Sequence, residues 1–215
     1  MILIPVKDLS NAKQRLSSVL DQSSRTELAK AMLCDVLEAV AQVAASVSVV
    51  TSDPYALSAA QEFGFQIIPD IRNHSETDAI ETATQVCLSR GVPNTLVIPA
   101  DIPLIQGSEL RAIFQAAPDE GAVLVPAADG RGTNAVFRSP ANLFPLRFGN
   151  DSFKPHLAAA QATGKPYRLL SLPGIALDID NPADLQKLAA RPGETRAQRL
   201  SRKWKLATLP LAANE

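Results

Sequence analysis

Three aspartates are the residues whose type and position in this sequence most favour chemistry. Asp101 follows the apolar run Thr95-Leu-Val-Ile98, and Asp178 and Asp180 stand two positions apart just before a helix start. Residues i and i+2 of an extended segment face the same side, so Asp178 and Asp180 can point at one site. Magnesium prefers carboxylate oxygens and keeps water or phosphate oxygens in its remaining positions. The three aspartates are therefore the predicted metal ligands, and a turn or cap is the alternative for each.

Three cations follow the first apolar run, Ile2 to Val6. Lys7, Lys13 and Arg15 fall beyond the carboxyl end of a strand, where open parallel sheets bind ligands, and they suit a triphosphate. No glycine precedes Gly64, which excludes a P-loop and a dinucleotide fingerprint at this turn. Phosphates must therefore be held by side-chain charge. Without the acidic groups, simple solvation of the cations would be the preferred explanation.

A glycine-marked segment, Phe148 to His156, has the pattern of a loop that opens a helix. Gly149 permits close backbone approach, Ser152 can cap the helix, and Lys154 can add charge beside the free N–H groups of the first turn. An ordinary helix cap is the alternative explanation. His156 lies at the same helix start and, without a serine or cysteine nucleophile motif, is predicted to contact a ligand at most.

Short β-rich runs alternate with helical patterns along the chain. This alternation predicts an α/β domain in three layers, with a mostly parallel sheet covered by helices on both faces. A further run, Asn134 to Phe137, has no helix before it and predicts an antiparallel element added over the sheet. The segment Asp129 to Asn134 fits a hairpin turn as well as a ligand site. The predicted parallel strands are residues 2–6, 46–51, 65–68, 95–98 and 122–125.

Capping residues predict where the helices begin. A side chain that accepts a hydrogen bond from a free N–H group, with an acidic residue three positions later, is typical of a helix N-terminus. Asp184 is assigned to such a first turn, where a carboxylate favours the helix dipole. The predicted starts are Ser24 with Glu27, Asp53 with Pro54, Ser75 with Asp78, and Asn181 with Pro182 and Asp184.

Composition and charge bound the class of protein. With 215 residues, 46% apolar and 20% charged, the chain can bury one sizeable core. A net charge of −1 provides no field for gathering nucleic acid. The most apolar stretch, residues 36–50, is interrupted by polar residues, and we expect a soluble cytoplasmic protein with no membrane partner. Cys34 and Cys87 lack metal-site spacing and are predicted to be buried, reduced thiols.

The chain divides into a predicted domain of residues 1–190 and a basic tail of residues 191–215. The spacing of the tail predicts a basic amphipathic helix. Packing of its apolar side on this domain, or on the second subunit of a homodimer, is favoured over nucleic-acid binding. The residues that carry the pattern are Arg196, Arg199, Leu200, Arg202, Lys203 and Trp204.

Six segments, taken in order, resemble the guanylyltransferases of coenzyme F-420 biosynthesis. That family transfers GMP from GTP to 2-phospho-L-lactate, phosphoenolpyruvate or 3-phosphoglycerate, with a fold similar to that of molybdopterin and sugar-nucleotide transferases. The resemblance runs from residue 2 to about residue 188. Its segments are Ile4-Pro-Val-Lys7, Ala12-Lys13-Gln-Arg15-Leu16, Pro99-Ala-Asp101-Ile-Pro103-Leu104, Gly130-Arg-Gly132-Thr133-Asn134, Phe148-Gly-Asn-Asp-Ser152-Phe153 with His156, and Asp178-Ile-Asp180-Asn-Pro182.

The resemblance implies Mg²⁺ as cofactor, GTP and a phosphorylated three-carbon acid as substrates, and a role for each candidate residue. By resemblance, the magnesium ligands are Asp101, Asp178 and Asp180, and the residues that face the triphosphate are Lys7, Lys13 and Arg15. The residues that the resemblance assigns to catalysis are Lys13, Arg15 and Asp101. Those that it assigns to contact with the acceptor acid are Thr133, Gly149 and Ser152.

Two departures from the family pattern concern the nucleotide side. Gln14 stands where the family usually has serine or threonine, and Ser75-Glu-Thr-Asp78-Ala79 replaces its usual Leu-Asn before alanine, which bears on the nucleotide pocket. A nucleotidyltransferase for a sugar phosphate or molybdopterin is one alternative, and the missing glycine-rich first loop argues against it. Two further alternatives belong to other classes. One is a noncatalytic nucleotide-binding regulator, which the candidate metal carboxylates disfavour. The other is a module that recruits a partner through the basic tail.

Overall fold

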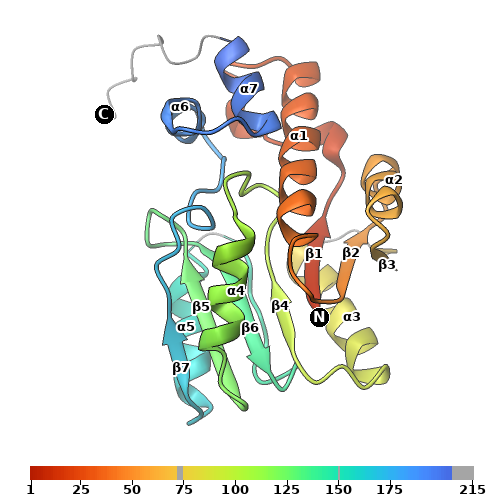
Figure 1. The fold of residues 1–215 in the computed structure, drawn as a ribbon, viewed down its shortest axis with the longest axis vertical. Helices are drawn as coiled ribbons and strands as arrows, with labels where there is room; N and C mark the ends of the chain where they lie inside the picture. The colour runs from red at the N-terminus through yellow and green to blue at the C-terminus, as the bar shows by residue number, and fades with distance from the viewer. Residues whose placement is uncertain (72–74, 150, 205–215) are drawn as a thin grey trace.

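The computed structural model describes residues 1–71, 75–149 and 151–204. Their strands form one seven-stranded sheet in the order β3-β2-β1-β4-β6-β5-β7, with helices on both faces, as predicted (Figure 1). All of these strands run parallel except β6, which is antiparallel to both neighbours. The strands are β1 (Ile2–Val6), β2 (Val47–Thr51), β3 (Gln66–Pro69), β4 (Thr95–Val97), β5 (Gly121–Pro126), β6 (Thr133–Ser139) and β7 (Tyr167–Leu169).

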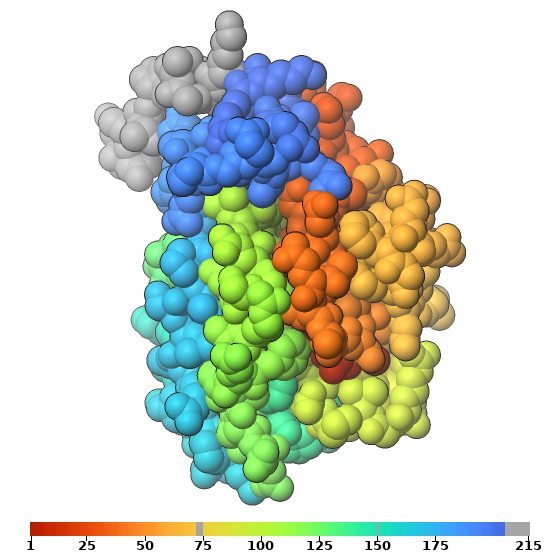
Figure 2. Space-filling model, in the orientation of Figure 1, coloured from red at the N-terminus to blue at the C-terminus, as the bar shows by residue number. Residues whose placement is uncertain are grey.

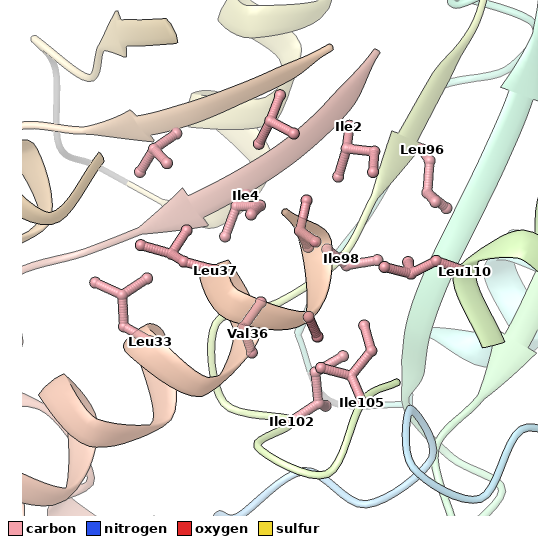
Figure 3. Close-up of a cluster of buried hydrophobic side chains, with 14 of the residues drawn as sticks. Ile2, Ile4, Leu33, Val36, Leu37, Leu96, Ile98, Ile102, Ile105 and Leu110 are labelled. Atoms are coloured by element: carbon pink, nitrogen blue, oxygen red, sulfur yellow. The ribbon is translucent and has the colours of Figure 1, made fainter. Parts of the chain in front are cut away.

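Both faces of the central strands are buried, because successive residues of a strand point to opposite sides. In β1, Ile2 and Ile4 belong to the core under α1 (Gln22–Val40), α2 (Pro54–Glu62) and α4 (Gly107–Ala116). Figure 3 shows Ile4 beside Leu37 of α1 and Ile2 on the side of Leu96 of β4. Leu3 belongs to the core on the opposite face, under α3 (Glu76–Ser89) and α5 (Phe153–Ala162).

The antiparallel element lies elsewhere than expected. Residues 134–137 do form a strand, but β6 is inserted between β4 and β5 within the sheet and does not lie over it. Because β6 runs antiparallel, its first residues lie at the carboxyl ends of its neighbours. The edge strand β7 is absent from the sequence-based prediction, since three exposed residues form too short a pattern to detect.

Most helix starts are confirmed. Asp53, Ser75 and Asn181 cap α2, α3 and α6 (Pro182–Ala190) with their side chains, and Asp184 completes the capping box of α6. The predicted start of α1 at Ser24 is wrong by one turn. The helix begins at Gln22, and the side chain of Asp21 accepts a hydrogen bond from the Ser24 N–H at 2.7 Å.

The predicted tail helix is confirmed as α7 (Arg196–Lys203), which packs against α1 and α6 at one end of the molecule (Figures 1 and 2). Residues 205–215 of the predicted tail lie outside the described residues. Within the described part of the chain, no helix is long and apolar enough to cross a membrane. Cys87 is buried as predicted, whereas Cys34 is only partly buried; both thiols are free.

Asp35 of α1 fixes the start of α7. Its carboxylate oxygens accept hydrogen bonds from the backbone N–H groups of Arg196 and Ala197, each at 2.9 Å. The Asp35 side chain is 3% exposed, whereas Glu38, which also pairs with Arg196, is 57% exposed. Burial raises the pKa of Asp35, and the hydrogen bonds from α7 oppose that shift. The buried carboxylate is therefore the main polar tie between the two helices.

We expect Asp35→Ala to lower the free energy of unfolding by about 3 kcal/mol, because it leaves backbone N–H groups of α7 without their acceptor. Glu38→Ala is the matched control and should cost less than about 0.5 kcal/mol, since exposed ion pairs contribute little. Urea denaturation followed by circular dichroism measures both. Equal losses in the two variants would show that the charge of Arg196, and not capping by Asp35, holds α7.

Candidate active site

A cavity of about 790 Å³ lies at the carboxyl edge of the sheet, lined by residues that follow β1, β4 and β5 and by the start of β6. This is the edge at which open parallel sheets bind ligands. Of the nine predicted site residues, only Lys7 is not part of its lining. The predicted residues that line this main cavity are Lys13, Arg15, Asp101, Thr133, Gly149, Ser152, Asp178 and Asp180.

Lys13 joins two acidic loops. Its Nζ lies 2.5 Å from Oδ2 of Asp101 and 2.9 Å from Oδ1 of Asp180. The residue has a left-handed backbone (φ +56°) between two short 3-10 helices, η1 (Leu9–Asn11) and η2 (Gln14–Leu16). Non-glycine residues rarely adopt this conformation, which concentrates at functional sites. Burial lowers the pKa of the Lys13 ammonium group. The carboxylates of Asp101 and Asp180 raise this pKa by more than burial lowers it, so Lys13 stays charged.

Asp101 has one carboxylate oxygen engaged and one left over. Oδ2 accepts from Lys13, whereas Oδ1 is buried and has no hydrogen-bond partner in the described part of the chain. The loop is held in place by the buried side chain of Ile102 and by a backbone hydrogen bond of 3.1 Å from Ile179 N to Asp101 O. A buried carboxylate oxygen without a partner is costly, so a ligand at this position would stabilise the site.

Asp178 is oriented by Asn134, a residue to which the sequence analysis assigns no role. Asn134 Nδ2 lies 3.0 Å from Asp178 Oδ1 and also donates to the carbonyls of Ile175 and Ala176, at 2.9 and 3.1 Å. Burial raises the pKa of Asp178, and the carboxylates of Asp101 and Asp180 raise it further, although the hydrogen bond from Asn134 opposes them. The three predicted metal ligands are thus close enough to repel one another.

Asp180 and Asp184 take different places, as predicted. Asp180 contacts Lys13 and Nη1 of Arg15, the latter at 3.4 Å. Burial raises the pKa of Asp180, but Lys13 and Arg15 outweigh it and hold the pKa below its ordinary value. Asp184 instead accepts from the backbone N–H groups of Asp180 and Asn181 at 3.4 and 3.3 Å, as part of the cap of α6.

Lys7 lines a neighbouring cavity of about 270 Å³ that shares Lys13, Glu76 and Asp101 with the main cavity. Its Nζ lies 2.6 Å from Oδ2 of Asp70, a buried carboxylate that the sequence analysis does not identify. The structure therefore places Lys7 beside the predicted triphosphate site, but its ammonium group is paired with Asp70, which directly follows β3.

Glu76 is a further acidic residue of the site that the sequence analysis misses. It stands at the first position of α3 and lines both cavities. Burial raises the pKa of its carboxyl group to about 7, and Asp101 adds to this shift while Lys13 and Lys7 oppose it. A helix cap at Ser75 explains the local sequence pattern completely. Only the departure of this segment from the family pattern points to Glu76.

The prediction that the Ser152 side chain caps a helix is wrong. Its hydroxyl does not cap α5; Ser152 Oγ instead accepts a hydrogen bond from the backbone N–H of Thr133 at 3.0 Å, which ties the start of α5 to β6. Gly149 has φ +127°, a backbone conformation that favours glycine, and it lines the main cavity. Lys154 is exposed and does not line this cavity, so it adds no charge there.

His156 is buried, and the structure does not place it in the main cavity as a ligand contact. Its ring is 1% exposed, lies edge-on to Phe148 with centroids 5.0 Å apart, and bonds to Arg147 N and Thr133 Oγ1 at 2.9 and 3.0 Å. Burial lowers the pKa of His156 to about 4, with Arg138 contributing in the same direction. The ring is therefore neutral at physiological pH.

The donor set of the cavity suits a divalent cation, although the described residues contain no ready cluster of ligands. Within the described residues, no three histidine, cysteine or acidic side chains converge at coordinating distances, because Lys13 lies between Asp101 and Asp180. The unpartnered Asp101 Oδ1 and the mutual repulsion that raises the pKa of Asp178 are nonetheless what a hard cation would relieve. The residues present fit such an ion.

The fold is similar to that of solved nucleotidyltransferase structures. A protein from Desulfovibrio desulfuricans G20, described as a nucleotide-diphospho-sugar transferase, has a TM-score of 0.75 at 17% identity and covers 94% of this chain and 93% of its own. A cytidylyltransferase from Leptospira borgpetersenii has a TM-score of 0.58 at 12% identity, with 95% and 92% covered. At these identities, the likeness concerns the fold.

The chain belongs to the family of CofC-like guanylyl transferases, whose family model matches residues 1–213. It is 36% identical over 203 residues to the phosphoenolpyruvate guanylyltransferase of Roseiflexus castenholzii, covering 94% of this chain and 93% of the relative. It is 31% identical over 208 residues to the 2-phospho-L-lactate guanylyltransferase of Methanothermobacter thermautotrophicus, covering 97% and 92%. The family resemblance carried by the six motifs is confirmed.

The pKa of His156 predicts a pH dependence of stability. Its folded value of about 4 lies below the value of about 6.5 in unfolded chains. The neutral ring therefore stabilises the fold fully above about pH 6.5, and this contribution, on the order of 3 kcal/mol, is lost as the pH falls towards 4. Urea denaturation between pH 7.5 and 4.5 should show a steeper loss for the wild type than for His156→Gln.

The control for this comparison is His74→Gln, which removes the other histidine of the sequence and lies outside the described residues. It should keep the steep pH dependence of the wild type. Parallel curves for the wild type and His156→Gln would mean that His156 is not held neutral.

Proposed function

We propose that this protein is a guanylyltransferase of coenzyme F-420 biosynthesis. It transfers GMP from GTP to a small phosphorylated three-carbon acid, namely 2-phospho-L-lactate, phosphoenolpyruvate or 3-phosphoglycerate, and releases pyrophosphate. The family to which the chain belongs and the names of its relatives support this reaction over transfer to a sugar phosphate or molybdopterin.

The observation that carries the proposal is the position of Lys13. Its ammonium group, held by Asp101 and Asp180, lies in one cavity with the hydroxyls of Thr133 and Ser152. We assign Lys13, Arg15 and the neighbouring Lys7 to the triphosphate. We assign Thr133, Gly149 and Ser152, which line the same cavity, to the acceptor acid.

This reaction requires no general base. The phosphate monoester of the acceptor has a second pKa near 6 and is already an ionised nucleophile at neutral pH. One of its oxygens attacks the α-phosphorus of GTP, the new P–O bond forms a diphosphate link, and the bond to the bridging oxygen breaks to release pyrophosphate. Lys13 and Arg15 stabilise the negative charge that develops on the phosphoryl oxygens. A neutral, buried His156 is consistent with this chemistry, because no proton needs to be removed.

The charge of the main cavity supports a requirement for a divalent cation. Six acidic side chains line it against three basic ones, whereas both substrates are polyanions. We propose Mg²⁺, held by Asp101, Asp178 and Asp180. When bound, a divalent ion supplies positive charge that screens the two phosphates and stabilises the transition state.

A matrix of substrates tests the proposed function. Each of GTP, ATP, CTP and UTP is combined with each phosphorylated acid, with a sugar phosphate and with molybdopterin, and pyrophosphate release is measured with Mg²⁺ and with excess chelator. We expect turnover with GTP and at least one of the acids, and none with chelator. Turnover with a sugar phosphate alone would assign another acceptor, and GTP binding without turnover on any acceptor would indicate a regulator.

Variants at three aspartates test the assignment of the acidic groups. We expect Asp101→Asn and Asp180→Asn each to lower kcat at least about 100-fold while the fold stays cooperative, because an amide keeps the shape but loses the charge. Asp184→Asn is the matched control and should cost about 1 kcal/mol of stability at an unchanged kcat, because its carboxylate serves the cap of α6. Equal catalytic losses at 180 and 184 would contradict this division.

A further inference from the structure

The hydrogen bonds of His156 determine which of its ring nitrogens carries the proton. A backbone N–H group can only donate, so Nε2, which bonds to Arg147 N at 2.9 Å, must be the unprotonated acceptor. In the neutral ring the proton then sits on Nδ1. Nδ1 lies 3.0 Å from Thr133 Oγ1 and must donate to it. The ring thus accepts from one segment and donates to another, and only this tautomer satisfies both contacts.

This tautomer leaves the hydrogen of the Thr133 hydroxyl available. Oγ1 accepts from His156, so the ring does not take up the hydroxyl hydrogen, and the described residues provide no acceptor for it. The Ser152 hydroxyl is in the same condition, because its oxygen accepts from Thr133 N and its hydrogen has no acceptor among the described residues. Both residues line the main cavity. Two hydroxyl hydrogens at this cavity are therefore left for a bond to a ligand.

The same histidine holds the loop that completes this end of the cavity. His156 Nε2 accepts a hydrogen bond from the backbone N–H of Arg147. The next backbone N–H, that of Phe148, donates to Thr77 Oγ1 of α3 at 3.0 Å. Gly149 follows directly and lines the cavity. A protonated ring would lose the acceptor for Arg147 N–H, and the low pKa of His156 prevents this at physiological pH.

We propose that His156 is a positioning residue: by donating to Thr133 Oγ1 it leaves the Thr133 hydroxyl hydrogen available, and Thr133 and Ser152 together donate to an oxyanion group of the acid. The inference rests on the proposed function and deepens it. Two adjacent donors match the oxygens of a carboxylate or of a phosphate, which share this chemistry, and they disfavour groups that offer only hydrogens.

Substitutions at Thr133 test the direction of the bond. Thr133→Val keeps the shape but has no donor, and we expect it to raise the KM of the acid between about 10- and 100-fold, the loss typical of a hydrogen bond to a charged group. The KM of GTP should stay within about twofold. Thr133→Ser keeps the donor and should restore the acid KM to within about threefold of wild type. Lys13→Ala should show the converse pattern, with GTP weakened more than the acid.

Chemical rescue tests the role of His156 itself. A hollow of about 240 Å³, lined in part by Pro145, Arg147 and His156, lies beside the ring and gives small molecules access to its position. We expect His156→Ala to raise the acid KM as Thr133→Val does, and imidazole, which can donate and accept at once, to lower it again. The control is 1-methylimidazole, which is one methyl group larger and in its neutral form can accept but not donate, and it should fail to rescue.

The outcomes separate this inference from the proposed function. If the wild type releases no pyrophosphate from GTP with any acid, the proposed function fails. If it does, but Thr133→Val leaves the acid KM unchanged or 1-methylimidazole rescues His156→Ala as well as imidazole does, the positioning role is overturned. Competitive inhibition by pyruvate and by inorganic phosphate identifies the oxyanion, since Thr133→Val should weaken at least one of them about tenfold. Unchanged inhibition by both would overturn the oxyanion site.

Discussion

The contact between Lys13 and two carboxylates from separate loops is the interaction on which the geometry of this site depends. Asp101 follows β4 and Asp180 precedes α6, and the lysine ammonium joins them. Burial lowers the pKa of Lys13, and the two carboxylates more than reverse that shift. Removing one acid would leave the lysine paired with the other, whereas removing both would leave a buried charge without a partner. The two carboxylates keep the lysine charged, and the charged lysine in turn holds the two loops together.

Sequence patterns predict this site well where local rules and sheet topology agree. Parallel strands bring their carboxyl ends to one edge, so an aspartate that follows a strand, Asp101, and the pair Asp178 and Asp180 before a capped helix converge from distant positions. Local rules alone are less secure. At the start of α1, Asp21 and Ser24 stand one turn apart, both can cap, and the apolar spacing that follows does not decide between them.

What sequence patterns cannot show is which side chains meet across elements. Asn134 reads as the end of a hairpin turn, yet its amide holds Asp178. Ser152 has the position of a helix cap, yet its oxygen accepts from Thr133. Glu76 is masked by a local pattern that a cap explains completely. Two of these contacts, those of Asn134 and Ser152, depend on the insertion of β6 between β4 and β5, a topological fact that no local pattern in the sequence encodes.

Electrostatics constrains how the main cavity can bind two anionic substrates. Acidic side chains outnumber basic ones around it, so the protein's own charge opposes the approach of an anionic acid and of GTP. Added positive charge beside Lys13 must compensate for this. The Thr133 hydroxyl can donate to an oxyanion only if its hydrogen is not already taken up by a neighbouring acceptor. A neutral histidine that donates to Thr133 Oγ1 leaves that hydrogen available, without adding a charge that would compete with Lys13 for the phosphates.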